Sequence, residues 1–256
     1  MKNIRIETEE RIAVLTIDRP DVRNALDRAT VDEIRAALRD LERDDAAGAL
    51  IVTGGGTQVF AAGADIRQMR ERTRDDGLSA INSSLFSEIE RFAKPTIAAI
   101  NGHALGGGCE LALACDLRIA ADHAKLGQPE VGLGIIPAAG ATQRLPRLIG
   151  LGRAKQLILT GEAIDARTAL DWGLVNAVAP AADLLATAHA WAARILSRGP
   201  LAIRLARLAL NASARVDLDS GLLIETLAQA ICLDSEDKRE GMTAFLEKRP
   251  PRFQGR

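Results

Sequence analysis

The chain has 256 residues, of which 47% are hydrophobic and 26% are charged, and its formal net charge is -1. This composition is typical of a globular protein, and the near-neutral charge gives no field that would favour nucleic acid or an acidic membrane surface. The sequence contains no apolar run long enough to cross a bilayer, and residues 1–10 alternate like a strand without the apolar core of a signal peptide.

Cysteine and histidine are sparse. The three cysteines, Cys109, Cys115 and Cys232, lack the spacing of a zinc site, and an odd number favours a reducing compartment over a disulfide framework. The histidines are too scattered in the sequence to indicate a metal cluster. We therefore expect no metal site, and we expect a cytoplasmic location.

The first part of the chain alternates predicted strands and helices. Asp27 is a predicted N-cap for a helix whose apolar residues recur at spacings of three and four. The glycine turn Gly54–Gly56 lacks the Lys-Ser or Lys-Thr of a phosphate loop, and no G-x-G-x-x-G pattern opens a helix, so nucleotides are poor candidate ligands. Strands rich in Ile and Val are predicted at residues 4–9, 12–18 and 49–53.

Small residues gather before the next predicted helix. The run Phe60–Ile66 reads FAAGADI, and its small side chains let the backbone approach a neighbour or a ligand closely. Asp65 can cap the helix that holds Ile66 and Met69. The alternative is a turn between a strand and a helix that needs small residues for packing alone.

The stretch Ala98–Arg118 reads AAINGHALGGGCELALACDLR. A buried strand ends at an Asn-Gly turn, three glycines follow at Gly106–Gly108, and a small apolar helix then carries Glu110 in its first turn. Glycines expose backbone N–H groups, and a helix start orients its unpaired N–H groups and the positive end of its dipole. The stretch predicts an anion or oxyanion site beside a carboxylate, and a turn built for packing explains the same residues equally well.

Beyond this stretch the pattern becomes helical. A strand is predicted over residues 117–121, and residues 125–137 are predicted to be irregular because glycine and proline are frequent there; they include one acid, Glu130. Residues 138–145 begin a helix, and from Gly150 onward helices are predicted nearly throughout. This order predicts an α/β core followed by a helical region.

Five segments stand out together: Asp18–Leu26, Phe60–Met69, Asn101–Asp116, Gly127–Leu145 and Asp237–Phe253. Taken in order, they resemble the crotonase superfamily of enoyl-CoA hydratases and isomerases, and the last of them resembles the tail of the hydratase branch. The resemblance covers essentially the whole chain. It implies a spiral of repeated β-β-α units over residues 1–197, with the CoA and active site, and a C-terminal helical oligomerisation region over residues 198–256.

The resemblance also implies roles for particular residues. In the family, a thioester carbonyl lies between two backbone N–H groups, at positions that match Ala64 and Gly107 here. Two glutamates hold a water, at positions that match Glu110 and Glu130. By the family pattern, Glu110 activates the water and Glu130 protonates the α-carbon. A solvated surface acid explains either glutamate taken alone, but both together favour catalysis.

The family wraps the bent CoA moiety around two segments, and this chain departs from the family pattern at two positions. Asp21 stands where many hydratases have a basic residue. Ala138 stands where many have a glycine whose amide lies near the catalytic water, so the donor remains while a methyl group is added. Contacts with CoA or substrate are expected from Val22, Arg23, Ala25, Ala62, Asp65, Ile66, Arg67 and Lys248, the last from a neighbouring subunit.

The activity implied by the resemblance is reversible syn addition of water to a trans-2-enoyl-CoA, which gives a 3-hydroxyacyl-CoA. It implies no cofactor beyond the CoA moiety of the substrate, and self-association as a trimer or hexamer. The alternatives are an enoyl-CoA isomerase or an aromatic-degradation acyl-CoA hydratase/isomerase of the same fold, an RNA-binding relative, and a catalytically silent member. A neutral chain without a basic or aromatic stripe argues against RNA, and the presence of both glutamates argues against a silent member.

Overall fold

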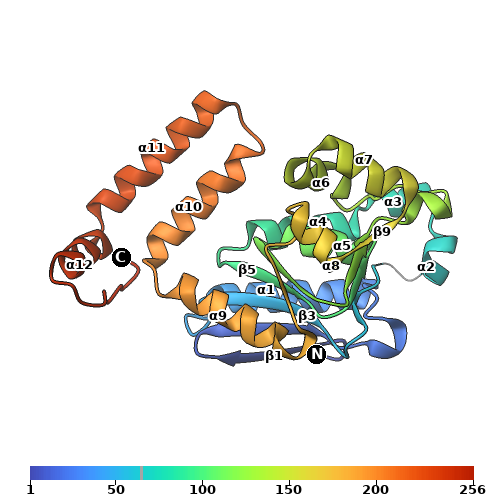
Figure 1. The fold of residues 1–256 in the computed structure, drawn as a ribbon, viewed down its shortest axis with the longest axis horizontal. Coiled ribbons are helices and arrows are strands. Elements are labelled where there is room, and N and C mark those ends of the chain that lie inside the picture. The colour runs from blue at the N-terminus through green and yellow to red at the C-terminus, as the bar shows by residue number, and fades with distance from the viewer. Residues whose placement is uncertain (64–65) are drawn as a thin grey trace. The chain divides into compact units, whose positions relative to one another are not determined.

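The computed structural model describes residues 1–63 and 66–256. The chain forms two compact units, Met1–Ala190 and Trp191–Arg256 (Figure 1). The division falls within helix α9 (Leu184–Leu196), near the boundary expected after residue 197. Among the described residues, no helix combines the length and the hydropathy needed to cross a membrane.

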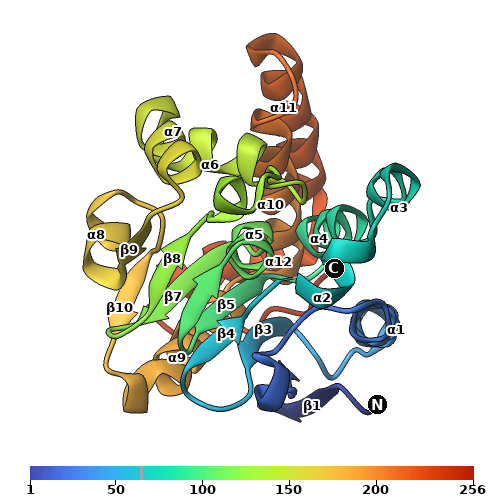
Figure 2. The same ribbon diagram turned by 90° about the vertical axis from the view of Figure 1, so that its right-hand side faces the viewer.

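Two sheets lie within the first unit (Figure 2). The larger has the order β1-β2-β3-β5-β7-β10, and the smaller has the order β4-β6-β8-β9. Pairing is parallel except for β1 with β2 and β8 with β9. The larger sheet comprises β1 (Ile4–Glu9), β2 (Ile12–Ile17), β3 (Ala49–Gly54), β5 (Thr96–Ile100), β7 (Leu117–Ala121) and β10 (Ala177–Ala179). The smaller comprises β4 (Val59–Ala61), β6 (His103–Leu105), β8 (Lys125–Gly127) and β9 (Ala163–Asp165).

From β3 to β8, successive strands alternate between the two sheets. Strands that follow each other in the chain divide between the sheets: β3, β5 and β7 belong to the larger sheet, and β4, β6 and β8 belong to the smaller. Helices follow β4, β6 and β8 in the chain. This is the repeated β-β-α arrangement that the resemblance implied, and the α/β spiral with C-terminal helices is confirmed. The remaining elements of this unit are α1 (Arg28–Arg43), α2 (Ile66–Glu71), α3 (Arg74–Leu78), α4 (Ile81–Arg91), α5 (Gly107–Ala114), α6 (Ala141–Ile149), α7 (Leu151–Thr160) and α8 (Ala166–Asp171), with 3-10 turns η1 (Pro20–Val22), η2 (Glu130–Leu133) and η3 (Ala181–Asp183).

Local sequence accounts for the ends of several helices. The Asp27 side chain accepts a hydrogen bond from the Thr30 N–H at 2.9 Å and caps α1, as predicted. The apolar residues of α1 are buried at the spacing of one helix face, which packs this helix onto the core. Asp165 caps α8 in the same way, through the N–H of Thr168.

Several short elements were not predicted from the sequence pattern. Residues 125–137 are not irregular throughout, because β8 and the 3-10 turn η2 form there. The region after Gly150 is interrupted by β9 and β10, where helices were predicted nearly throughout. Each of these strands has three residues, which is too short for the alternation that reveals a strand in a sequence.

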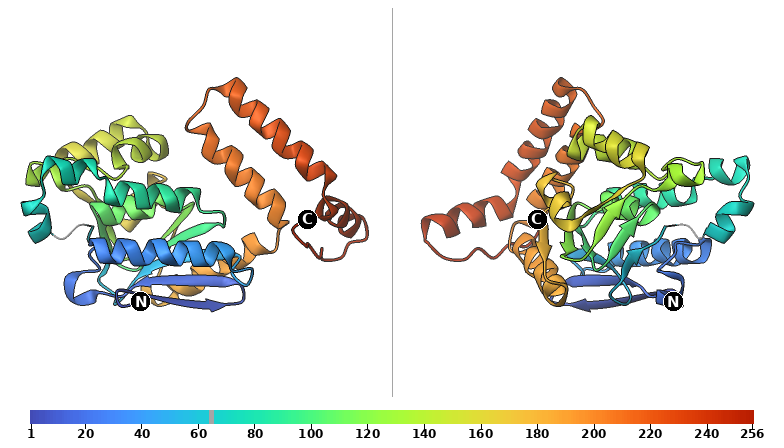
Figure 3. Two further views of the ribbon diagram at one scale, coloured as in Figure 1. Left: turned by 180° about the vertical axis from the view of Figure 1, so that it is seen from behind. Right: turned by 45° about the vertical axis from the view of Figure 1, so that its right-hand side comes forward.

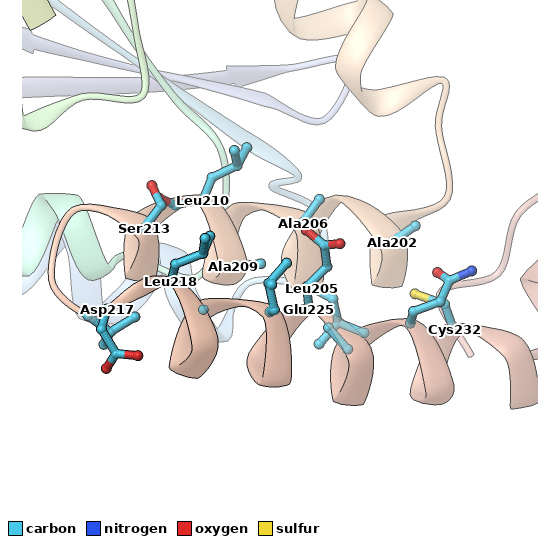
Figure 4. Close-up of a pocket in the computed structure, with 15 residues that line it drawn as sticks. Ala202, Leu205, Ala206, Ala209, Leu210, Ser213, Asp217, Leu218, Glu225 and Cys232 are labelled. Carbon is cyan, nitrogen blue, oxygen red and sulfur yellow. The ribbon is translucent and has the colours of Figure 1, made fainter.

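The second unit begins within α9, and beyond the end of that helix it continues as helices and a C-terminal tail. Helices α10 (Pro200–Ser213) and α11 (Leu218–Asp234) pack side by side as a hairpin, and α12 (Glu236–Leu246) follows (Figure 3). A groove runs along the hairpin between residues of α10, such as Leu205, and residues of α11, such as Leu222 (Figure 4). The tail returns to α12, where the buried carboxylate of Asp237 accepts hydrogen bonds from the N–H groups of Gln254 and Gly255.

Candidate active site

The glycine turn before α5 is tightly packed. Gly106 has a φ of +55°, a backbone conformation that side chains rarely adopt, and it precedes the helix start at Gly107. A Cβ atom on Gly108 would lie 1.7 Å from the carbonyl oxygen of Ala61 on β4, so only glycine fits there. The start of α5 is therefore pressed onto strand β4, and Gly107 begins the helix beside Gly63, whose Cβ position is 2.8 Å from the Gly107 nitrogen.

Glu110 is a buried acid within α5, with 3% of its surface exposed. Its Oε1 atom accepts hydrogen bonds from the backbone N–H groups of Ala139 at 2.7 Å and Ala141 at 3.0 Å. Burial raises the pKa of this carboxyl above its ordinary value, while the two N–H groups and the charge of Arg144 act in the opposite direction. The sequence predicted a helix start with a carboxylate beside it, and the structure buries that carboxylate against a second turn.

Glu130 begins the 3-10 turn η2 and lies against the glycine turn. Its Oε1 atom is 2.9 Å from the position that a Cβ on Gly106 would occupy. With its amide nitrogen turned toward the acid, buried Gln128 donates to both carboxylate oxygens at 3.1 Å. Burial and the charge of Glu110 together raise the pKa of Glu130 to about 7.

Two of the segments expected to bind CoA lie side by side. The Ala62 N–H donates to the carbonyl of Arg23 at 3.1 Å, and the Leu26 N–H donates to the carbonyl of Gly63 at 2.7 Å. Val22 and Arg23 are exposed, whereas Ala25 is buried. The loop after β2 and the end of β4 therefore form one continuous surface element.

The structure places the remaining predicted residues in different ways. Ile66 begins α2 and is exposed, and Ala138 is an exposed residue immediately before the turn that holds Glu110. Lys248 belongs to the second unit, is exposed and has a φ of 54°. The predictions for Ala64, Asp65 and the side chain of Arg67 fall outside the described residues.

Two polar residues at this site were missed from the sequence. Gln128 is 0% exposed and faces Glu130, and only its place two residues before that acid could have indicated it. Arg144 donates to the carbonyl of Ala139 at 3.0 Å and pairs with Glu90 of α4 at 3.0 Å. Nothing distinguishes Arg144 in the sequence, where lysine and arginine together number 33.

The described residues of this site give no sign of a nucleophilic thiol or of a metal centre. Cys109 is buried, and burial together with the nearby charge of Glu110 raises its pKa to about 12, which keeps the thiol neutral at physiological pH. Among the residues that the structure describes, no group of three His, Cys, Asp or Glu side chains is arranged to hold a metal ion. The arrangement is suited to acid–base chemistry between two carboxyl groups of different acidity.

The comparisons with known proteins identify the family of this chain. The family model for enoyl-CoA hydratase/isomerase matches residues 7–256, and the chain belongs to this family. The chain is 49% identical over 254 residues to the crotonyl-CoA hydratase of Syntrophomonas wolfei, with 98% of each chain covered. It is 45% identical to the short-chain-enoyl-CoA hydratase of Clostridium acetobutylicum, with 97% of this chain and 96% of that protein covered.

A solved structure gives the same assignment. The enoyl-CoA hydratase from Bacillus anthracis superposes with a TM-score of 0.96 at 40% sequence identity, and each chain is covered completely. The resemblance found in the sequence is therefore confirmed for the family and for the fold.

Proposed function

We propose that this protein is an enoyl-CoA hydratase, which adds water reversibly and syn to a trans-2-enoyl-CoA and gives a 3-hydroxyacyl-CoA. The observation that carries the proposal is the pair of carboxyl groups at one glycine turn, Glu110 on α5 and Glu130 on η2. Relatives named as crotonyl-CoA and short-chain enoyl-CoA hydratases over nearly the full chain support the same activity.

The surroundings of the two acids support a division of labour. Glu110 accepts two backbone hydrogen bonds and has Arg144 nearby, and these contacts favour its charged form against the effect of burial. Glu130 has a pKa raised to about 7 and holds a proton over much of the neutral range. Glu110 then takes a proton from water as the water oxygen bonds to the β-carbon, and Glu130 gives its proton to the α-carbon. The amide of Ala138, next to the turn that binds Glu110, is the proposed neighbour of this water.

The thioester oxygen gains negative charge as the β-carbon is attacked. We assign its stabilisation to the backbone N–H groups of Gly107 and Ala64. Gly107 is the first residue of α5, where the N–H groups have no partner within the helix and the helix dipole favours negative charge. Loss of one such donor costs about 3 kcal/mol of transition-state stabilisation in comparable sites.

The CoA moiety is the only cofactor-like group that the proposal requires. Its binding surface is the element formed by the loop after β2 and the end of β4, which the hydrogen bonds between residues 23 and 62 hold together. The proposed contacts are Val22, Arg23, Ala25, Ala62, Asp65, Ile66 and Arg67, with Lys248 from a neighbouring subunit.

Self-association as a trimer or hexamer is part of the proposal. The hairpin of the second unit supports it, because Leu210, Leu218 and Leu223 are 71%, 76% and 60% exposed in a single chain. Apolar side chains of this size favour burial against another copy. A cytoplasmic location remains a prediction.

The direct test is loss of the conjugated enoyl-thioester absorbance of crotonyl-CoA. We expect rapid loss with the wild-type protein and a loss of activity of about 10²–10⁴-fold in Glu110→Gln. Glu162→Gln is the matched control, because this acid is exposed and belongs to the turn after α7. No loss with crotonyl-CoA or a longer enoyl-CoA, while a 3-enoyl-CoA is converted, would replace the proposal with an isomerase of the same fold.

A further inference from the structure

Arg144 connects the turn that binds Glu110 with helix α4. From the first turn of α6, its Nη1 atom donates to the carbonyl of Ala139 at 3.0 Å, and its Nη2 atom donates to the Glu90 carboxylate at 3.0 Å. The Arg144 side chain is 15% exposed and that of Glu90 is 28% exposed. A partly buried ion pair of this kind acts more strongly on its surroundings than a pair at the surface.

The contacts of Arg144 lead directly to Glu110. Ala139 receives a hydrogen bond from Arg144 at its carbonyl and gives one to Glu110 from its N–H, at 2.7 Å. The guanidinium also packs against the next residue, because a Cβ on Gly140 would lie 1.9 Å from the Nη1 atom. Arg144 therefore fixes the orientation of the peptide units whose N–H groups hold the carboxylate of Glu110.

We propose that Arg144 and Glu90 are positioning residues for the hydration reaction. Arg144 holds the donor turn against Glu110 and favours its charged form, and Glu90 limits how strongly the charge of Arg144 acts on that carboxylate. This inference rests on the proposed function for its consequence in catalysis. Its structural part, the control of the charge state of Glu110, can be measured without any activity.

Within the described part of the chain, the charged and titratable groups considered around Glu110 come from helices α4, α5 and α6 and the turn η2. Arg144 of α6 lowers the pKa of Glu110, and burial raises it. Glu130 of η2 is coupled to Glu110, since the charge of Glu110 raises the pKa of Glu130. Cys109 of α5 stays neutral because its pKa is raised to about 12, and Glu90 of α4 pairs with the guanidinium. Arg144 is the cation in this set, so its removal and the removal of Glu90 have opposite electrostatic effects.

The test compares Arg144→Gln with Glu90→Gln. Glutamine at residue 144 keeps a donor for the Ala139 carbonyl and removes the positive charge, so the acidic limb of the kcat/KM profile moves to higher pH and activity at pH 6 falls by about tenfold or more. Glutamine at residue 90 leaves the cation without this partner, so the acidic limb moves to lower pH. KM for crotonyl-CoA changes little in either variant, because the assigned CoA surface includes neither side chain.

Matched controls remove the same charges from exposed positions of the same helices. Arg147→Gln alters α6 at a side chain that donates to the Gln143 carbonyl, and Glu88→Gln alters α4 at an acid paired with Arg35. Both controls should leave the acidic limb unmoved. Thermal unfolding reports whether each variant is folded. The double variant Arg144→Gln/Glu90→Gln removes both charges together, and it is used in place of a single variant that does not fold.

A titration of carboxyl-labelled glutamate by NMR separates this proposal from the proposed function. The Glu110 resonance is identified by its absence in Glu110→Gln, and it should titrate at higher pH in Arg144→Gln and at lower pH in Glu90→Gln. That result in a protein without hydratase activity would support the positioning pair and overturn the hydratase. Folded variants whose Glu110 titrates as in the wild type, or shifts in one common direction, would overturn the positioning pair.

Discussion

Glu110 and Glu130 meet at one glycine turn, yet they stand in different surroundings. Glu110 lies within a regular helix, is 3% exposed, and accepts hydrogen bonds from two backbone N–H groups of the turn after η2. Glu130 lies in a short 3-10 turn, is partly exposed, and faces the side-chain amide of Gln128. One acid is held by the main chain, and the other by a side chain.

The difference shows how a fold can give two identical side chains different acidities. Backbone N–H groups and an arginine oppose the effect of burial at Glu110, whereas at Glu130 burial and a neighbouring negative charge act in the same direction. The surroundings of Glu110 thus include groups that favour its charged form, whereas those of Glu130 favour its protonated form. The resemblance found in the sequence implied a different role for each acid, and the structure adds a physical difference between their surroundings.

The largest expected effect is a difference between Glu130→Gln and Glu110→Gln in the rate of α-proton exchange. Butyryl-CoA has no double bond to hydrate, so exchange of its α-proton in D₂O requires only the group that serves the α-carbon and the oxyanion donors. We expect Glu130→Gln to lose this exchange by about 10²–10⁴-fold, and Glu110→Gln to keep it within about tenfold of the wild type. Proton NMR of the α-methylene signal measures both rates.

The control for this difference is hydration of crotonyl-CoA, which both variants should lose. An exchange rate that falls equally in the two variants would show that the acids act as one unit, and the division of labour would be wrong. Exchange lost in Glu110→Gln alone would reverse the assignment.

The second prediction compares the elements that carry the two acids, which are helix α5 for Glu110 and the 3-10 turn η2 for Glu130. The Cβ of Gly108→Ala would meet the Ala61 carbonyl at 1.7 Å, so the helix of Glu110 must move away from β4. We expect a loss of about 3 kcal/mol in the free energy of unfolding. Gly132→Ala is the matched control in the turn of Glu130, where a Cβ has no neighbour within 4 Å and the change should cost less than about 0.5 kcal/mol.

Urea unfolding at a fixed protein concentration measures both variants. A Gly108→Ala protein as stable as the wild type would mean that α5 and β4 can separate without cost. The two acids would then not differ in the rigidity of the elements that carry them.

The longer helices and strands were predictable from the sequence. Helix α1 was visible from its N-cap at Asp27 and its apolar spacing, and the strand before the glycine turn was visible as an apolar run. The second strands of the β-β-α units were not, because β6 and β8 have three residues each and their partners in the smaller sheet come from distant parts of the chain. The repeat lies in the order of strands between two sheets, and no repeated sequence is needed to produce it.

The residues of the candidate site also fall into two groups, those that the sequence predicted and those that it did not. Glu110 and Glu130 were predicted because they stand in motifs, and Gly107 because it belongs to the glycine turn. Arg144 and Gln128 were missed because their importance comes from the groups that they contact. Arg144 donates to the carbonyl of Ala139, and Gln128 donates to the carboxylate of Glu130. Such contacts follow from the tertiary fold, and residue type alone does not reveal them.

The smallest expected effect is a gain of stability when Glu130 is neutralised. The pKa of this carboxyl rises from 4.5 to about 7 in the folded protein, so the folded state binds its proton more tightly than the unfolded state does. The resulting stability is present in full below pH 4.5 and is lost as the pH rises through about 7, where the folded protein must hold a charge in a poorly solvated place. Glutamine carries no such charge. The difference in pKa corresponds to about 3 kcal/mol, and solvent screening of this partly exposed group reduces the expected gain to about 1–2 kcal/mol at pH 8.

Urea unfolding of Glu130→Gln at pH 8 and pH 5 measures this gain, with Glu162→Gln as the exposed control. The gain should be largest at pH 8 and should shrink toward pH 5, because the folded carboxyl of Glu130 is then largely protonated and carries no buried charge. An equal gain at both pH values would trace the effect to packing, and a loss at pH 8 would mean that Gln128 stabilises the charged carboxylate more than burial destabilises it. Because the same substitution should abolish α-proton exchange, a gain at pH 8 would identify the raised pKa of Glu130 as a stability cost that the folded protein retains for catalysis.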